Sequence, residues 1–177
     1  MEKENLVGNA NPLFLRFINR EAGFTDMVRS FANSPDPRTS EIAVKAMSAP
    51  IDLKPFRKEI EDAVRDIIKT GLGEEFKAFV NHYMEPSLVE EQVITQSKLG
   101  ESRVQIATIK DENAPWVQGF VCYNLCLYVK AFGLEDLKAC KACNKLFSHK
   151  GRYATYCSDG CKKKGIAPSQ GLFKTRI

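Results

Sequence analysis

The chain has 177 residues, which suits one medium-sized domain or one domain with a small appendage. Hydrophobic residues make up 44% and charged residues 27%, proportions typical of a globular protein that builds its core without disulfides. The net charge of +4 excludes a strongly basic or strongly acidic chain, although the charge is unevenly distributed along the sequence.

The beginning of the chain and its most apolar segment indicate a cytoplasmic protein with no membrane contact. The first ten residues, MEKENLVGNA, lack the basic start and apolar run of a secretory signal. Residues 115–132 include Gln118, Asn124 and Lys130, and the segment is shorter than the ~20 apolar residues that a spanning helix needs. In a reducing compartment, clustered cysteines favour metal binding over disulfides.

Apolar residues recur at helical spacing through the first half of the chain. Helices are expected over residues 12–20, 25–32 and 53–70. Pro35 and Pro37 stop the second of these, because neither proline supplies a backbone N–H group. A further helix over residues 74–84 is expected to end at Pro86.

The second half of the chain adds one strand and one buried helix. Residues 102–109, SRVQIATI, alternate well enough to predict a strand. Residues 115–132 begin with proline, end before Gly133 and are apolar on most sides, which predicts the central helix of the fold. Residues 1–138 therefore predict a helical body that senses a ligand, dimerises or receives a protein partner.

Four of the six cysteines form two pairs with thirteen residues between them, Cys140 with Cys143 and Cys157 with Cys161. A gap of two residues lets both thiolates of a tight turn face one ion. A gap of three residues places two cysteines on the same side of a helix's first turn. Four thiolates in a tetrahedral array are typical of zinc, so residues 139–165 predict a finger with one structural Zn²⁺.

The residues between the two pairs predict the rest of the finger. Leu146 and Phe147 are expected to pair with residues 153–156 as a hairpin, with the turn at residues 149–151. A helix is expected to open at Cys157 and Ser158. Knuckle, hairpin and helix in this order form a treble clef. The whole chain is thus expected to be mainly α with a small β-hairpin, ending in a tail over residues 166–177.

Other chemistry at the cysteines explains the pattern less well. A thioredoxin-like redox pair does not account for the second pair, and the spacing does not favour an iron–sulfur cluster. Catalytic zinc needs an open position for water, which four thiolates fill.

The C-terminal segment resembles the CGNR-type zinc fingers of bacterial transcriptional regulators, in which the finger follows a helical ABATE domain. The resemblance covers about a fifth of the chain. Where the family has Cys-Gly-Asn-Arg, this chain has Cys161 followed by three lysines, and its last cysteine gap is one residue shorter. The shared residues are Cys140, Cys143, Phe147, Arg152, Tyr156, Cys157, Ser158 and Cys161.

Basic residues concentrate in the finger and the tail. Residues 140–177 contain nine Lys or Arg and one acid, whereas residues 1–139 contain 17 Lys or Arg and 21 acids. A basic end on an acidic body favours an anionic partner. We predict salt-dependent contacts with DNA, or with RNA as the alternative, with Arg152 or Asn144 as candidates for base contacts. The predicted contact residues are Lys141, Lys145, Lys150, Arg152, Lys162, Lys163 and Lys164.

Two other interpretations remain open. In the first, the finger is purely structural and binds a protein partner, and its lysines are solvated surface. In the second, the protein is an enzyme with structural zinc. The chain contains no P-loop, no G-x-G-x-x-G and no H-E-x-x-H motif, so we expect no enzyme. Cys122 and Cys126 share one face of the apolar helix and are interpreted as small buried hydrophobic residues.

Overall fold

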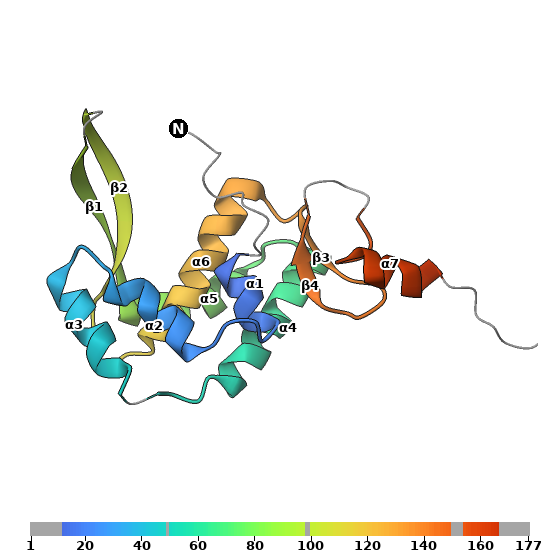
Figure 1. Cartoon of the computed structure of the whole chain (residues 1–177), viewed down its shortest axis with the longest axis horizontal. Coiled ribbons are helices and arrows are strands. Elements are labelled where there is room, and N and C mark those ends of the chain that lie inside the picture. The colour runs from blue at the N-terminus through green and yellow to red at the C-terminus, as the bar shows by residue number, and fades with distance from the viewer. Residues whose placement is uncertain (1–11, 49, 98–99, 150–153, 167–177) are drawn as a thin grey trace, which may run out of the picture.

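The computed structural model describes residues 12–48, 50–97, 100–149 and 154–166. These residues form seven helices and two antiparallel two-stranded sheets (Figure 1). The prediction of a mainly α fold is confirmed. None of the helices in the described ranges combines the length and the apolar character needed to cross a membrane.

The elements follow one another with few long connections. In chain order they are α1 (Leu13–Ile18), α2 (Phe24–Ala32), α3 (Pro37–Ala46), α4 (Lys54–Thr70), α5 (Glu74–Ser87), β1 (Leu88–Ser97), β2 (Gly100–Ile109), α6 (Trp116–Phe132), β3 (Leu137–Ala139), β4 (Leu146–Ser148) and α7 (Asp159–Ile166).

The helix α3 was not predicted, because the two prolines at residues 35 and 37 were interpreted only as a stop. Pro37 is instead the first residue of a new helix, where its missing N–H group costs nothing. The Asp36 carboxylate caps this helix by accepting the N–H of Thr39 at 2.8 Å. Hydrogen bonding from Thr39 also lowers the pKa of Asp36.

The helix α5 runs through Pro86 to Ser87 instead of ending before the proline. Its last turn leads directly into β1, and the end of β2 returns to the same place. The Lys110 N–H donates to the Ser87 carbonyl at 2.9 Å, and the Lys110 ammonium donates to the Glu85 carbonyl at 3.3 Å. These bonds satisfy carbonyl groups that a helix end otherwise leaves unpaired.

The strands β1 and β2 form a long hairpin that projects from the helices (Figure 1). The two strands pair in register from Leu88 opposite Ile109 to Ser97 opposite Gly100. Only the second strand was predicted. At the base of the hairpin, the Ile109 N–H donates to the buried Thr39 hydroxyl at 3.0 Å, which ties the hairpin to α3.

The central helix α6 confirms the prediction for residues 115–132. Val121 and Leu125 are fully buried, and Trp116 is 3% exposed. Aromatic rings of two other helices pack on this helix, because Phe31 of α2 contacts Trp116 and Phe14 of α1 contacts Tyr128 at centroid distances of 5.4 Å. The core therefore lies around α6, with α1, α2 and α5 against it and with α4 packed on α1 and α5.

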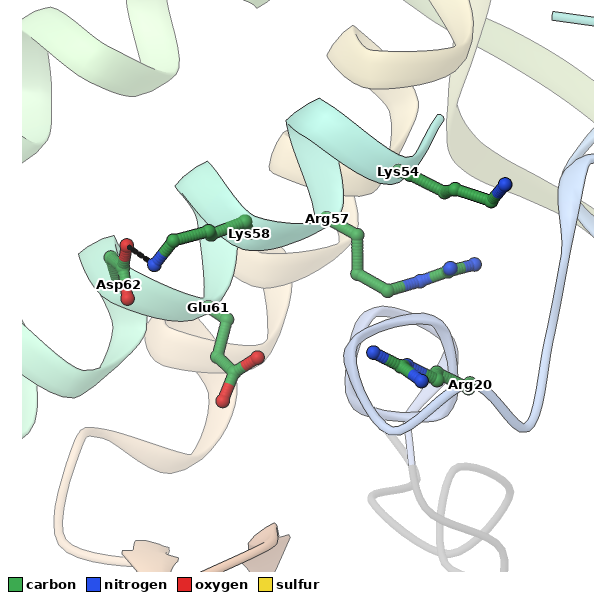
Figure 2. Close-up of a pocket in the computed structure, with 6 residues that line it drawn as sticks. All are labelled: Arg20, Lys54, Arg57, Lys58, Glu61 and Asp62. Carbon is green, nitrogen blue, oxygen red and sulfur yellow. Dashed lines mark hydrogen bonds and ion pairs between the residues drawn. The ribbon is translucent and has the colours of Figure 1, made fainter. Parts of the chain in front are cut away.

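The end of α1 meets the first turns of α4 (Figure 2). Arg20 has a φ of 63° and follows the last turn of α1, in the left-handed position that glycine usually takes. The Phe17 carbonyl accepts the Arg20 N–H at 3.1 Å, and the Glu21 N–H donates to the Arg16 carbonyl at 2.7 Å. This pair of bonds is a Schellman ending, which turns the chain sharply beside α4.

The helices α5 and α6 approach each other closely at Gly119. A Cβ atom at this position would lie 2.8 Å from the Tyr83 carbonyl oxygen and 3.0 Å from the Ser87 Cβ. Backbone cannot move as a flexible side chain does, so any residue larger than glycine must push the two helices apart.

We expect Gly119→Ala to lower the free energy of unfolding by about 1–3 kcal/mol, because it overpacks the contact between α5 and α6. Chemical denaturation measures this change. Gly160→Ala is the matched control, since Gly160 also lies in a helix but its Cβ would meet only the Ser158 hydroxyl at 3.8 Å. Equal stability of the two variants would show that the helices tolerate separation.

Candidate metal centre

The four clustered cysteines meet in space. Their sulfur atoms all lie within 4.8 Å of one another. The Sγ atoms of Cys143 and Cys157 are 3.5 Å apart, and those of Cys157 and Cys161 are 3.6 Å apart. A tetrahedral ion with metal–sulfur bonds of ≈ 2.3 Å separates its sulfurs by about 3.8 Å. The cluster therefore has the right size for one metal ion and is too open for disulfides, whose sulfurs lie ≈ 2.05 Å apart.

The first pair of cysteines lies in the tight turn between β3 and β4. The Asn144 N–H donates to the Cys140 carbonyl at 2.8 Å, and the Cys140 N–H donates to the Lys145 carbonyl at 2.9 Å. Asn144 closes this turn with a φ of 58°, a left-handed conformation that asparagine tolerates better than most residues. The turn holds Cys140 and Cys143 on one side, as the two-residue gap predicts.

The second pair lies at the start of α7, as predicted. The Ser158 hydroxyl accepts the Cys161 N–H at 3.2 Å, and the Ser158 carbonyl accepts the Lys162 N–H at 2.9 Å. Ser158 thus caps the helix. Cys157 precedes the cap and Cys161 lies in the first turn, so both sulfurs face the first pair.

The predicted pairing of Leu146 and Phe147 with residues 154–156 is wrong, whereas residue 153 and residues 150–151 of the predicted turn lie outside the described residues. The strand β4 pairs with β3 instead, so that Leu146 lies opposite Ala139 and Phe147 opposite Lys138. The short cysteine turn places the strands on either side of it next to each other, which makes the local pairing available first. Residues 154–156 lie against the turn without forming a strand, and the Thr155 carbonyl accepts the Lys141 N–H at 3.0 Å.

The surroundings of the sulfurs favour a thiolate at Cys140. Burial raises the pKa of this thiol, but backbone N–H groups of Cys157, Cys143 and Ala142 outweigh burial and lower the pKa to about 6. Two effects raise the pKa of Cys157 to about 12: the larger is burial, and the smaller is hydrogen bonding with the neighbouring thiols. A second negative charge beside the first is unfavourable, and a cation between the sulfurs would remove this repulsion.

The cysteine turn is anchored to the helical body. Leu137 and Leu146 are 2% and 1% exposed and belong to the same hydrophobic cluster as α1, α4 and α6. The Asn19 side-chain amide donates to the Leu146 carbonyl at 2.7 Å, and the Tyr128 and Ser148 hydroxyls are 2.5 Å apart. The finger therefore packs on the body, although the division into two domains at residue 138 stays a prediction.

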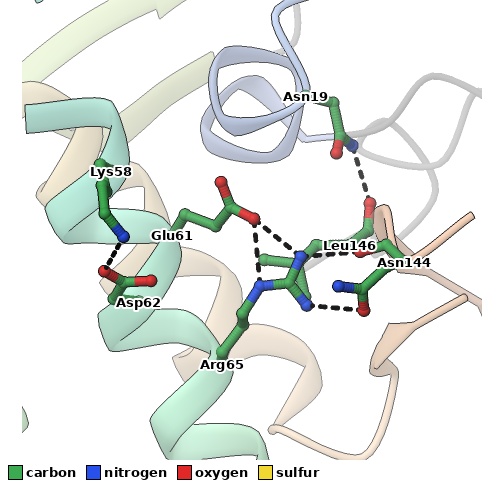
Figure 3. A network of polar contacts seen from close by, with 7 residues as sticks. All are labelled: Asn19, Lys58, Glu61, Asp62, Arg65, Asn144 and Leu146. Carbon is green, nitrogen blue, oxygen red and sulfur yellow. Dashed lines mark hydrogen bonds and ion pairs between the residues drawn. The ribbon is translucent and has the colours of Figure 1, made fainter. Parts of the chain in front are cut away.

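Arg65 of α4 also links the body to the turn by polar contacts (Figure 3). Its guanidinium donates to the Glu61 carboxylate at 2.7 and 3.0 Å, to the Asn144 carbonyl at 2.7 Å and to the Asn144 side-chain oxygen at 3.2 Å. Asn144 was a candidate for contacting bases, but the structure gives it this structural role. Sequence reasoning missed Arg65, because 79 residues separate it from Asn144 and no local pattern joins them.

The predicted nucleic-acid contacts fall into three groups. Lys162, Lys163 and Lys164 are exposed on α7, and Lys141 is exposed on the turn. Lys145 is also exposed, but its ammonium lies 3.7 Å from the Glu21 carboxylate. The remaining two residues, Lys150 and Arg152, lie outside the described residues, as does the tail beyond residue 166.

The remaining cysteines, Cys122 and Cys126, are not part of the cluster. Cys122 is fully buried in α6, and the Cys126 sulfur lies 4.0 Å from the Met84 sulfur. Burial raises the pKa of both thiols, so both stay neutral at physiological pH. Within the described residues, no group of metal-binding side chains forms around them. They pack as small hydrophobic residues, as predicted.

The chain matches no protein-family model, no curated protein and no solved structure. The four-cysteine cluster agrees with the resemblance to zinc fingers, whereas the CGNR type stays a prediction that rests on the residues of the finger.

We expect the purified protein to hold one metal ion per chain. Cys143→Ala should lower this ratio well below one, because removing a thiolate from a four-sulfur site weakens binding strongly. Cys126→Ala is the matched control and should keep one ion. Elemental analysis measures the ratio, and the absorption spectrum of the cobalt-substituted protein reports sulfur ligation. Wild-type protein that holds no metal ion, or Cys143→Ala protein that keeps one ion per chain, would contradict the metal centre.

We expect Arg65→Gln to lower the free energy of unfolding by about 1–2 kcal/mol, because the Asn144 carbonyl and the Glu61 carboxylate both lose a charged partner. Lys58→Gln is the matched control. Lys58 also forms an i,i+4 ion pair on α4, with Asp62, but its side chain is 78% exposed against 23% for Arg65. An exposed pair contributes little to stability, because water and salt screen it. Similar losses in urea denaturation would contradict the role of Arg65.

Proposed function

We propose that the protein is a zinc-finger nucleic-acid-binding protein, a bacterial transcriptional regulator whose finger contacts DNA phosphates. The observation that supports this proposal most is the position of Lys162, Lys163 and Lys164. They follow Cys161 directly on α7 and are all exposed, so a metal that holds the start of α7 also orients three cations toward solvent.

Zinc suits the metal centre better than other common ions. Four thiolates select a soft metal in tetrahedral geometry, and the sulfur distances agree with zinc–sulfur bonds. The four residues that would hold it are Cys140, Cys143, Cys157 and Cys161. A complete set of sulfur ligands leaves no position for a reacting water, so the ion would stabilise the finger and would perform no catalysis.

The finger would bind nucleic acid mainly through charge. Lysine contacts with phosphates release bound counterions, which makes the affinity fall steeply as salt rises. Such contacts position the protein without reading the sequence. DNA is the preferred ligand because the resemblance is to transcriptional regulators, and RNA is the alternative.

A second candidate function is a protein-binding adaptor with a purely structural finger. The observation that favours it is the position of Lys163 and Lys164 in the last turn of α7. Positive side chains at a helix C-terminus stabilise the helix dipole, which explains these lysines without any nucleic acid. The adaptor predicts no affinity for DNA at low salt.

We expect the zinc-loaded protein to bind a random-sequence DNA duplex with a strong dependence on salt. Replacing Lys162, Lys163 and Lys164 by alanine should weaken binding at least tenfold at low salt and reduce the slope of log K against log salt by about 2–3. Fluorescence anisotropy over a series of salt concentrations measures both quantities, and competition with RNA separates the two nucleic acids.

The control for this experiment removes the same charge from the body. Lys69, Lys77 and Lys130 are exposed on α4, α5 and α6, so their triple alanine variant tests whether net charge alone explains binding. Equal weakening by both triple variants would contradict a contact surface on α7. Absence of binding by the wild type at low salt would favour the adaptor.

A further inference from the structure

A hollow of ≈ 450 Å³ lies between the end of α1 and the first half of α4 (Figure 2). Its size falls in the range of sites for small ligands. It lies on the body, and none of the four clustered cysteines lines it. The hollow is lined by Arg20, Lys54, Arg57, Lys58, Glu61 and Asp62.

Positive charge is in excess in this hollow. Both acids already have partners, because Asp62 pairs with Lys58 at 2.9 Å and Glu61 pairs with Arg65 at 2.7 Å. Arg20, Lys54 and Arg57 form no ion pair with any carboxylate of the described residues. In Figure 2, Lys54 and Arg57 extend away from the Lys58–Asp62 pair, and Arg20 lies below Arg57 at the end of α1. Three cations thus line one hollow whose two carboxylates are paired with other residues.

The Arg57 guanidinium is held in place before any ligand arrives. Its Nε donates to the Phe17 carbonyl at 2.9 Å, and the central guanidinium carbon, Cζ, lies 4.7 Å from the centre of the Phe17 ring. The ring attracts the cation, and the hydrogen bond sets the orientation of the guanidinium plane. The two Nη groups have no hydrogen-bond acceptor among the described residues, so they remain available for a planar pair of oxygens.

Two backbone features add to the positive field. The Phe17 carbonyl that accepts from Arg57 also accepts the Arg20 N–H, so one carbonyl brings both arginines to the same edge of the hollow. Lys54 is the first residue of α4, and the N-terminus of a helix carries partial positive charge. The left-handed Arg20 is a costly conformation for arginine, and it places this residue at the hollow instead of continuing the helix.

We propose that this hollow binds the phosphate group of a small phosphomonoester, with Arg57 as the bidentate partner of two oxygens and with Arg20 and Lys54 beside it. A phosphomonoester carries ≈ −1.5 to −2 charge near neutral pH, which matches three unpaired cations better than the single charge of a phosphodiester. The helical body would then recognise a phosphorylated small molecule, independently of nucleic-acid binding by the finger.

The test is a titration of the full-length, metal-loaded protein at pH 8 and constant ionic strength, followed by NMR. Phenyl phosphate is the monoester probe and dimethyl phosphate is the diester probe. We expect phenyl phosphate to shift the amide signals around the end of α1 and the start of α4. We expect dimethyl phosphate to bind at least tenfold more weakly.

The variant Arg20→Asn with Lys54→Gln should raise the Kd for phenyl phosphate at least tenfold. Asparagine tolerates the left-handed conformation, so this variant is expected to fold, and thermal unfolding and metal content verify this. Lys69→Gln removes one exposed charge near the other end of α4 and should leave the Kd unchanged. An unchanged Kd in the double variant, or equal affinity for the two probes, would overturn the proposal.

A second arm separates this site from the finger by using a DNA duplex without terminal phosphates. The double variant should bind this duplex as the wild type does, whereas the triple lysine variant of α7 should not. If the double variant lost duplex binding and kept its affinity for phenyl phosphate, the hollow would be a contact for the nucleic-acid backbone, and the monoester proposal would be wrong.

Discussion

The burial of two leucines determines where the four sulfurs meet. Leu137 and Leu146 lie on either side of the cysteine turn and are buried among the body helices, where burial stabilises each side chain by roughly 1.5–3 kcal/mol. Because the strands that carry them pair with each other, the turn between them has one orientation. The finger is thus built on the core of the body, and a metal ion would complete an arrangement that packing has already positioned.

Polar contacts beside these two leucines also join the finger to the helical body. Arg65 donates to both the Glu61 carboxylate and the backbone of the turn, so one guanidinium neutralises an acid of the body and holds Asn144 in its left-handed conformation. Glu61 also borders the hollow that Arg20 and Arg57 line. Glu61 and Arg65 therefore connect the hollow of the body to the cysteine turn of the finger. The lysines of α7 remain exposed to solvent.

Local pattern was a good guide to helices and a poor guide to strands. The apolar spacing over residues 53–70 predicted α4, because this helix buries one side. Residues 115–132 predicted α6, because this segment is apolar on most sides and lies between a proline and Gly133. The strand β1 was missed because residues 88–97, LVEEQVITQS, do not alternate regularly between apolar and polar residues. Pairing with β2 stabilises this strand more than its own pattern indicates. The start of α3 had a local signal that was overlooked, namely an aspartate cap followed by proline.

The sequence by itself determined the cysteine pairs, the helical class and the basic end, because each depends on residues a few positions apart. Only the tertiary structure decided that β4 pairs with β3, that Arg65 holds Asn144 and that Arg20, Lys54 and Arg57 line one hollow. The contacts of Arg65 with Asn144 and of Arg20 with α4 join residues that are distant in the chain. The strands β3 and β4 are close in the chain, but burial of Leu137 and Leu146 against the body selects this pairing over the one with residues 154–156. Spacing along the chain carries information about local geometry, whereas packing selects among the long-range contacts that local geometry leaves open.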